Sequence, residues 1–145
     1  YEISTRGWSS DVCSSDLGPV LSSVLARRVS RAHGWQRTGS RIQDHVEAIA
    51  HTLFQSSVEE VGTFFWPDTL PPGSKVSFRG PVDGQQRAVD EVCMEELRDL
   101  AQQASSVSTD EDDCLVKMAR RLGIQRLRAA SRSRLTVALH SVVEQ

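Results

Sequence analysis

The chain of 145 residues has 17 Lys and Arg side chains against 19 Asp and Glu, a formal net charge of −2 at pH 7, and 39% hydrophobic residues. This nearly neutral charge excludes a protein that holds nucleic acid through a strongly basic surface, so such contacts would come from local patches. No apolar run approaches the roughly 18 residues of a membrane span, and the length suits one compact domain or two very small lobes.

The first seventeen residues, YEISTRGWSSDVCSSDL, resemble the translation of a sequencing-library adapter. We therefore exclude residues 1–17 from the fold prediction as non-structural. They also lack the basic stretch and apolar core of a secretory leader. Without this stretch, which holds Arg6 and three carboxylates, the chain has 16 basic and 16 acidic side chains.

Residues 22–54 are predicted to form two helices joined by a sharp turn. Ser22 or Ser23 is expected to cap the first helix, and Gly34 to end it. The second helix is expected to begin between Thr38 and Ser40. Apolar side chains recur at helical spacing in both helices, at Val24, Leu25, Val29, Ala32, Ile42, Val46, Ile49, Leu53 and Phe54. A Gly-containing turn this short makes the helices cross, which is helix-turn-helix geometry.

A small β-hairpin is predicted next, because the apolar and aromatic residues on either side of Gly62-Thr63 favour two short strands with a tight turn there. Residues 75–79 alternate between polar and apolar, as in a third short strand or an irregular edge. Two helices followed by a hairpin is the order of a winged helix. The composition of residues 80–85 is typical of a linker.

Three further helices are predicted after this linker. The third spans about residues 86–104, and its buried side chains are Val89, Val92, Cys93, Leu97 and Leu100. The fourth begins at the acidic run 110–113, where carboxylates complement the positive helix end, and it ends at Gly123. The fifth spans about residues 129–143.

The second half of the chain loosely repeats the first. Gly34-Trp35-Gln36-Arg37 corresponds to Gly123-Ile124-Gln125-Arg126, and Ser40-Arg41-Ile42 corresponds to Ser133-Arg134-Leu135, which places four extra residues in the second turn. The predicted fold is therefore mainly α with a small β-hairpin, a winged-helix or helix-turn-helix-like tandem repeat. Its two related halves would be residues 18–79 and 86–145.

Several short segments carry a family resemblance: Leu25-Ala26-Arg27-Arg28, Gly34, Arg37, Gly39-Ser40-Arg41-Ile42, Trp66-Pro67 and Arg121-Leu122-Gly123. Through them, residues 18–145 resemble a C-terminal domain of unknown function on very large bacterial proteins. Those proteins also carry a superfamily-one helicase core and often a short-patch-repair-like endonuclease domain. The resemblance implies that the chain is a C-terminal fragment of a helicase-like DNA-processing protein. It also implies a further helix upstream, and the helicase or nuclease domains of the parent chain as partners.

Basic residues at the two turns are the candidate nucleic-acid-binding site: Arg37, Ser40, Arg41, Arg126, Arg128, Arg132 and Arg134. In helix-turn-helix proteins the start of the second helix approaches the groove, where Arg contacts phosphates or guanine edges. The alternative is that these Arg pair with Asp44, Glu47 or the acidic run 110–113. We expect a non-catalytic module that positions nucleic acid, with DNA favoured. The alternative function is a protein or intramolecular docking module without nucleic-acid contact.

No other motif indicates chemistry. His33, His45, His51 and His140 share no metal-ligand spacing with Cys93 or Cys114. Residues 110–113 lack the spacing of a calcium loop, and residues 80–84 are not a phosphate loop. We therefore expect no catalytic residues, metal, cofactor, small-molecule substrate or membrane partner. Two cysteines without CxxC spacing, in apolar helical patterns, favour buried thiols in a reducing compartment and a cytoplasmic location.

Overall fold

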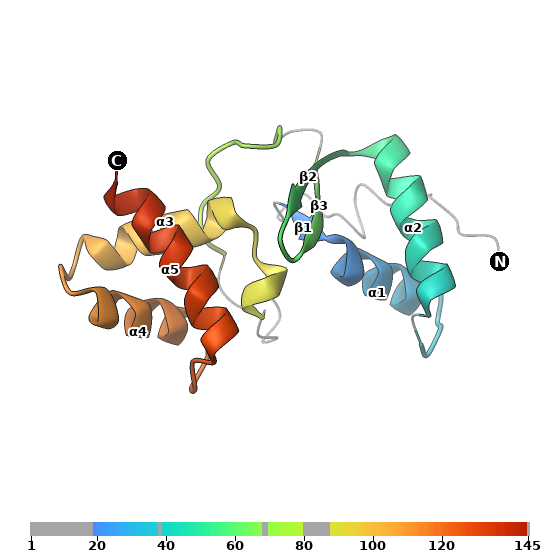
Figure 1. The fold of residues 1–145 in the computed structure, drawn as a ribbon. Coiled ribbons are helices and arrows are strands. Elements are labelled where there is room, and N and C mark those ends of the chain that lie inside the picture. The colour runs from blue at the N-terminus through green and yellow to red at the C-terminus, as the bar shows by residue number, and fades with distance from the viewer. Residues whose placement is uncertain (1–18, 38, 68–69, 80–87, 145) are drawn as a thin grey trace. The chain divides into compact units, whose positions relative to one another are not determined.

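The computed structural model describes residues 19–37, 39–67, 70–79 and 88–144. The adapter-like stretch at 1–17 and the predicted linker at 80–85 lie outside the described residues. The chain divides into two compact units, Tyr1–Ser74 and Lys75–Gln145. The described part is mostly helical, with five α-helices and one three-stranded antiparallel sheet (Figure 1). None of the described helices is long and apolar enough to cross a membrane.

The first unit combines the sheet with two helices. Its elements are β1 (Val20–Leu21), α1 (Ser22–Ala32), α2 (Ser40–Leu53), β2 (Gln55–Glu59) and β3 (Gly62–Trp66). The strand order is β1-β3-β2, so β3 has a neighbour on each edge. The two helices therefore lie, in sequence, between the two outer strands.

The hairpin turn falls two residues before its predicted position. Glu59 pairs with Gly62, so Glu60 and Val61 form the turn instead of Gly62-Thr63. With this register Phe64, Phe65 and Trp66 are buried. The predicted hairpin is confirmed, and its turn is corrected.

The helices of the first unit bury one stripe each, as helical periodicity predicts. The core consists of Val20, Leu25, Ala26, Val29, Ile42, Val46, Ala50 and Phe65. Ala32 and Leu53 were expected to face inward and are exposed. The predicted serine cap on α1 is also wrong, since Leu21 is the N-cap residue and both serines lie inside the helix. The reason is that Val20–Leu21 pairs with β3, so the chain passes directly from strand to helix.

The second unit is helical. It contains a 3₁₀ turn, η2 (Val89–Glu91), followed by α3 (Met94–Ser105), α4 (Glu111–Arg121) and α5 (Ala129–Val143). Its core includes Val89, Val92, Leu97, Leu100, Ala101, Cys114, Leu115, Met118, Leu122, Leu135, Ala138 and Leu139. The fifth helix has the predicted bounds. A side-chain oxygen of Asp110 accepts a hydrogen bond from the Asp113 amide at 3.3 Å, which confirms the predicted acidic start of α4.

The predicted third helix begins later than expected. Residues 89–91 form a separate 3₁₀ turn, and α3 starts only at Met94. A long-range contact explains the break: the Arg134 guanidinium group on α5 donates to the carbonyl oxygens of Val89 and Val92, at 3.3 and 2.7 Å. The Val89 carbonyl also accepts the Val92 amide at 3.2 Å, so the guanidinium group adds to the 3₁₀ turn and holds the break in place.

Residues 75–79 do not form the predicted third strand. Both edges of β3 are already paired, and the segment packs on α3 within the second unit. The Phe78 amide donates to Asp99 Oδ2 at 2.8 Å, and the Arg79 guanidinium group pairs with the fully buried Glu96 carboxylate. The alternation of polar and apolar residues at 75–79 therefore reflects packing of this segment against α3.

Candidate functional site

Two helix corners have the same backbone structure. Gly34 ends α1 with a φ of 74°, and its amide donates to the Arg31 carbonyl at 3.1 Å. Gly123 ends α4 with a φ of 78°, and its amide donates to the Arg120 carbonyl at 3.0 Å. This left-handed ending satisfies helix carbonyls that otherwise lack donors, and glycine adopts it without a steric penalty.

The two corners also have the same length. The next helix begins at Ser40 in the first corner and at Ala129 in the second. The offset is 89 residues both from Gly34 to Gly123 and from Ser40 to Ala129. The four extra residues predicted in the second turn are therefore absent, and Ser133 lies inside α5 instead of at its start.

The predicted site residues of the first corner lie on the surface. Arg37, Ser40 and Arg41 are exposed, at and just before the start of α2. Within the described part of the chain, no carboxylate forms an ion pair with Arg37 or Arg41. Glu47, one of the expected partners, instead lies 3.8 Å from His51 Nε2. These two arginines are consequently available to an external anion.

The predicted site residues of the second corner are exposed in three cases and buried in one. Arg126 and Arg128 are exposed, and no ion pair to either occurs among the described residues. Arg132 is exposed and pairs with Asp112. Arg134 was predicted to contact nucleic acid, but it is only 9% exposed and binds two backbone carbonyls. We therefore leave Arg134 out of the candidate interface.

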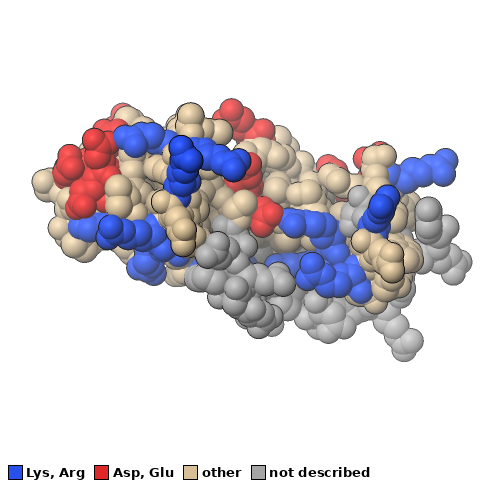
Figure 2. Space-filling view, turned by 90° about the horizontal axis from the view of Figure 1, so that it is seen from below, with Lys and Arg blue, Asp and Glu red and all other residues tan. Residues whose placement is uncertain are grey.

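Two carboxylates at the start of α4 lie close to side-chain nitrogen atoms. Lys117 Nζ lies 2.8 Å from an Asp113 carboxylate oxygen, and His140 Nε2 lies 3.3 Å from Glu111 Oε2. Hydrogen bonds from Lys117 and then Ser108 lower the pKa of Asp113 below 3.8. In Figure 2, Lys and Arg side chains lie over both units, and acidic side chains gather at one end of the second unit.

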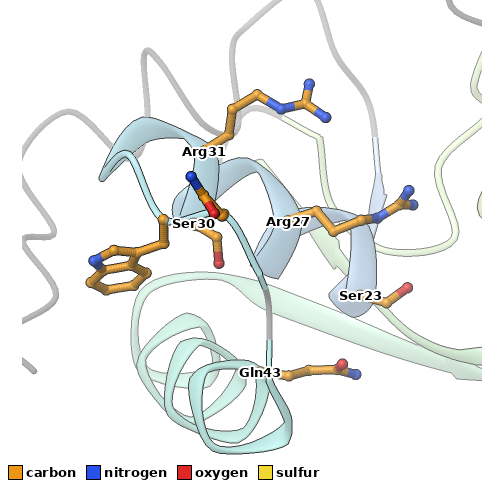
Figure 3. Close-up of a pocket in the computed structure, with 7 residues that line it drawn as sticks. Ser23, Arg27, Ser30, Arg31 and Gln43 are labelled. Atoms are coloured by element: carbon orange, nitrogen blue, oxygen red, sulfur yellow. The ribbon is translucent and has the colours of Figure 1, made fainter.

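A polar pocket of about 440 Å³ adjoins the first corner. Its lining residues come from α1, the turn and α2: Ser23, Arg27, Ser30, Arg31, Trp35, Gln36 and Gln43. Figure 3 shows Ser23 and Arg27 on α1 and Gln43 on α2 directed to the same side of the corner. Among the described residues, the lining contains two guanidinium groups and no carboxylate.

Sequence reasoning missed this pocket. Helical periodicity places Arg27 and Arg31 on the wet side of an amphipathic helix, and it identifies Trp35 only as part of a repeat. The available signal was the i,i+4 spacing of the two arginines, which places them side by side on a helix, with an aromatic residue directly after the helix-ending Gly34.

A second depression lies on the α3–α4 hairpin and has a different character. It measures about 320 Å³, and its lining consists of Leu100, Gln103, Ala104, Val107, Lys117, Arg120 and Arg121. Val107 is 73% exposed, so its apolar side chain is accessible beside this depression. The depression therefore combines an apolar floor with a basic rim.

Comparison with known protein families finds a match for one short segment of the chain. Residues 18–44, which span α1, its turn and the start of α2, match the family described as "Protein of unknown function (DUF3320)". That family is found in helicase-like proteins. Searches of curated proteins and of solved structures found no match.

The described residues contain no group of three or more His, Cys, Asp or Glu side chains that could hold a metal ion. Cys93 and Cys114 are both buried, as the sequence pattern predicts. Burial raises the pKa of the Cys114 thiol above its usual 9.0, so the reactive thiolate is disfavoured.

Proposed function

We propose that the chain is a non-catalytic C-terminal module of a helicase-like DNA-processing protein, and that it positions nucleic acid through its Arg-rich corners. The observation that carries the proposal is the position of Arg37 and Arg41, which are exposed at the start of α2 without a carboxylate partner among the described residues. In helix-turn-helix proteins this part of the second helix approaches the phosphates and the groove. The family match at residues 18–44 supports a helicase-like parent.

We propose that the first unit has a winged-helix-like fold. Its strand order, β1-β3-β2, with both helices between β1 and β2, supports this assignment. On this proposal α2 is the recognition helix and the β2–β3 hairpin is the wing. The constant offset of 89 residues between the two corners supports an internal repeat, in which Arg126 takes the position of Arg37.

The helices that follow the two corners suit anion binding. Neither α2 nor α5 has an acidic residue in its first turn or a side-chain hydrogen bond at its N-cap. By contrast, α3 and α4 both begin with carboxylates. Free amide groups and the positive end of the helix dipole attract phosphate, and exposed arginines beside them add to that attraction.

A direct binding assay tests the proposal. Fluorescence anisotropy would measure the affinity of the chain for labelled duplex DNA at low salt. We expect Arg37→Ala with Arg41→Ala to weaken binding about tenfold, because phosphate contacts dominate such affinities. The matched control is Lys75→Ala with Arg98→Ala, which removes two exposed charges from the other unit. Equal losses in both double variants, or failure of the parent chain to bind either duplex or single-stranded DNA, would refute the proposal.

The second candidate function is protein docking without nucleic-acid contact. The depression on α3–α4 favours it, because an apolar floor with a basic rim fits an acidic amphipathic helix, such as one from the motor or nuclease of the parent chain. Docking predicts that Val107→Asp and Arg120→Glu abolish co-purification with the upstream parent domains. It also predicts that Arg37→Ala with Arg41→Ala changes neither that interaction nor any DNA affinity.

A further inference from the structure

We infer that the pocket beside the first corner holds one unpaired nucleotide of a nucleic-acid strand, with its phosphate on Arg27 and Arg31 and its base against Trp35. The inference rests on the proposed function and deepens it, because it names single-stranded nucleic acid as the preferred ligand. The pocket volume of about 440 Å³ lies within the range of roughly 300–1,000 Å³ typical of small-ligand sites.

The phosphate subsite is formed by α1. Arg27 and Arg31 lie four residues apart on its exposed face, so their side chains project from neighbouring positions. The planar donor fork of a guanidinium group matches the oxygens of a phosphate. Within the described part of the chain, neither α1 nor the other lining residues contribute a carboxylate that would repel the anion.

The base subsite is formed by Trp35, which makes a backbone hydrogen bond and a ring contact at the end of α1. Its amide donates to the Ser30 carbonyl at 2.9 Å, as part of the left-handed ending of α1. Its indole stacks on the His33 ring, with centroids 4.7 Å apart and an interplanar angle of 24°. His33 Nδ1 in turn lies 2.9 Å from the Val29 carbonyl oxygen. An aromatic side chain held in this way provides a stacking surface that accepts any base.

The preference for an unpaired nucleotide follows from the remaining lining residues. Gln36 and Gln43 each carry a side-chain amide, which offers both a donor and an acceptor. Such groups can bond the hydrogen-bonding edge of a base only when that edge is free of its complement. A duplex offers the phosphates but not these edges, so it would satisfy only the arginine part of the pocket.

The test uses the full chain with a labelled twelve-nucleotide single strand and the matching duplex. Arg27→Ala with Arg31→Ala should weaken single-strand binding about tenfold or more. It should also lower the slope of log affinity against log salt by about 0.7 for each phosphate that the variant no longer neutralises. The control is again Lys75→Ala with Arg98→Ala. Trp35→Ala should cost about tenfold, the size of one base-stacking interaction.

Tryptophan fluorescence provides a readout that a purely structural role would not change. Binding of the strand should quench the emission, and Trp35→Phe should remove that quenching while retaining most of the affinity. Circular dichroism establishes that each variant is folded. Should Trp35→Ala fail to fold, Trp35→Phe and the double arginine variant decide the question.

Two results would overturn the inference. If folded Arg27→Ala with Arg31→Ala binds the strand as tightly as the parent, while Arg37→Ala with Arg41→Ala binds duplex more weakly, the inference is wrong and the proposed function stands. If deoxyadenosine monophosphate binds and the strand does not, the pocket is a mononucleotide site. Failure of the parent chain to bind either strand or duplex would instead remove the proposed function itself.

Discussion

Trp35 and Ile124 occupy equivalent positions, each one residue beyond a glycine in the left-handed conformation. Their amides donate to the carbonyls of Ser30 and Ala119, both at 2.9 Å. The two helices that end at these bonds, α1 and α4, each have 11 residues. The same backbone device therefore redirects the chain in both units, and it brings basic side chains to the start of the following helix.

Gly34→Ala should destabilise the first unit through backbone strain alone. A Cβ at this position would meet no atom within 4 Å, so the cost comes from the positive φ, about 1–2 kcal/mol. Urea unfolding measures this loss. Gly39→Ser is the matched control, because Gly39 has a φ of −79° and serine is a favourable N-cap residue. Equal stability of Gly34→Ala and the parent would contradict the observed conformation.

Arg134→Ala should lower stability far more than it lowers DNA affinity. The change leaves the Val89 and Val92 carbonyls without their side-chain donor and opens a cavity, so we expect a loss of about 3 kcal/mol. Arg132→Ala is the control: its pair with Asp112 is exposed, and its removal should cost below about 1 kcal/mol. Thermal and urea unfolding compare the two. If Arg134→Ala is neutral for stability but weakens DNA binding, its structural role is refuted.

The ion pair between Arg79 and Glu96 should show strong coupling in a double-mutant cycle. Glu96 is fully buried, so Arg79→Met removes the guanidinium group that pairs with it and should cost about 3 kcal/mol. Adding Glu96→Leu should recover much of that stability, because well-packed apolar residues often replace buried ion pairs without cost. Independent, additive effects in urea unfolding would show that the two side chains do not interact.

The free energy of unfolding of the second unit should fall at acidic pH, because Asp113 becomes protonated. Its pKa is lowered by hydrogen bonds from Lys117 and Ser108, so folding favours the ionised form. The resulting stabilisation is present above the ordinary pKa of 3.8 and is lost as the pH falls through the lower value in the folded chain. The urea midpoint of Asp113→Asn should therefore fall less between pH 5 and pH 2.5 than that of the parent. An unchanged acid dependence would contradict this assignment.

Local sequence patterns predicted the elements well where the structure depends on local interactions. The bounds of α5, the acidic start of α4 and the glycine ends of α1 and α4 all follow from periodicity, capping chemistry and backbone freedom. The fold class predicted from sequence, mainly helical with a small hairpin, is likewise confirmed.

Interactions between distant residues account for what the sequence could not reveal. The start of α3 depends on Arg134, more than forty residues away, and the start of α1 depends on pairing with β3. The predicted four-residue insertion comes from matching Ser40 with Ser133, although a match without gaps exists at an offset of 89. The pocket at the first corner could not be predicted, because its lining residues come together only where α1 and α2 cross.

The salt dependence of duplex DNA binding tests the central claim most directly. Log affinity would be measured against log salt for the parent chain and for a variant with Arg37, Arg41, Arg126 and Arg128 all changed to Ala. If each arginine neutralises a phosphate, the slope should become shallower by about 0.9 for each arginine replaced. An unchanged slope, in a variant that unfolds like the parent, would show that the corners do not hold nucleic acid.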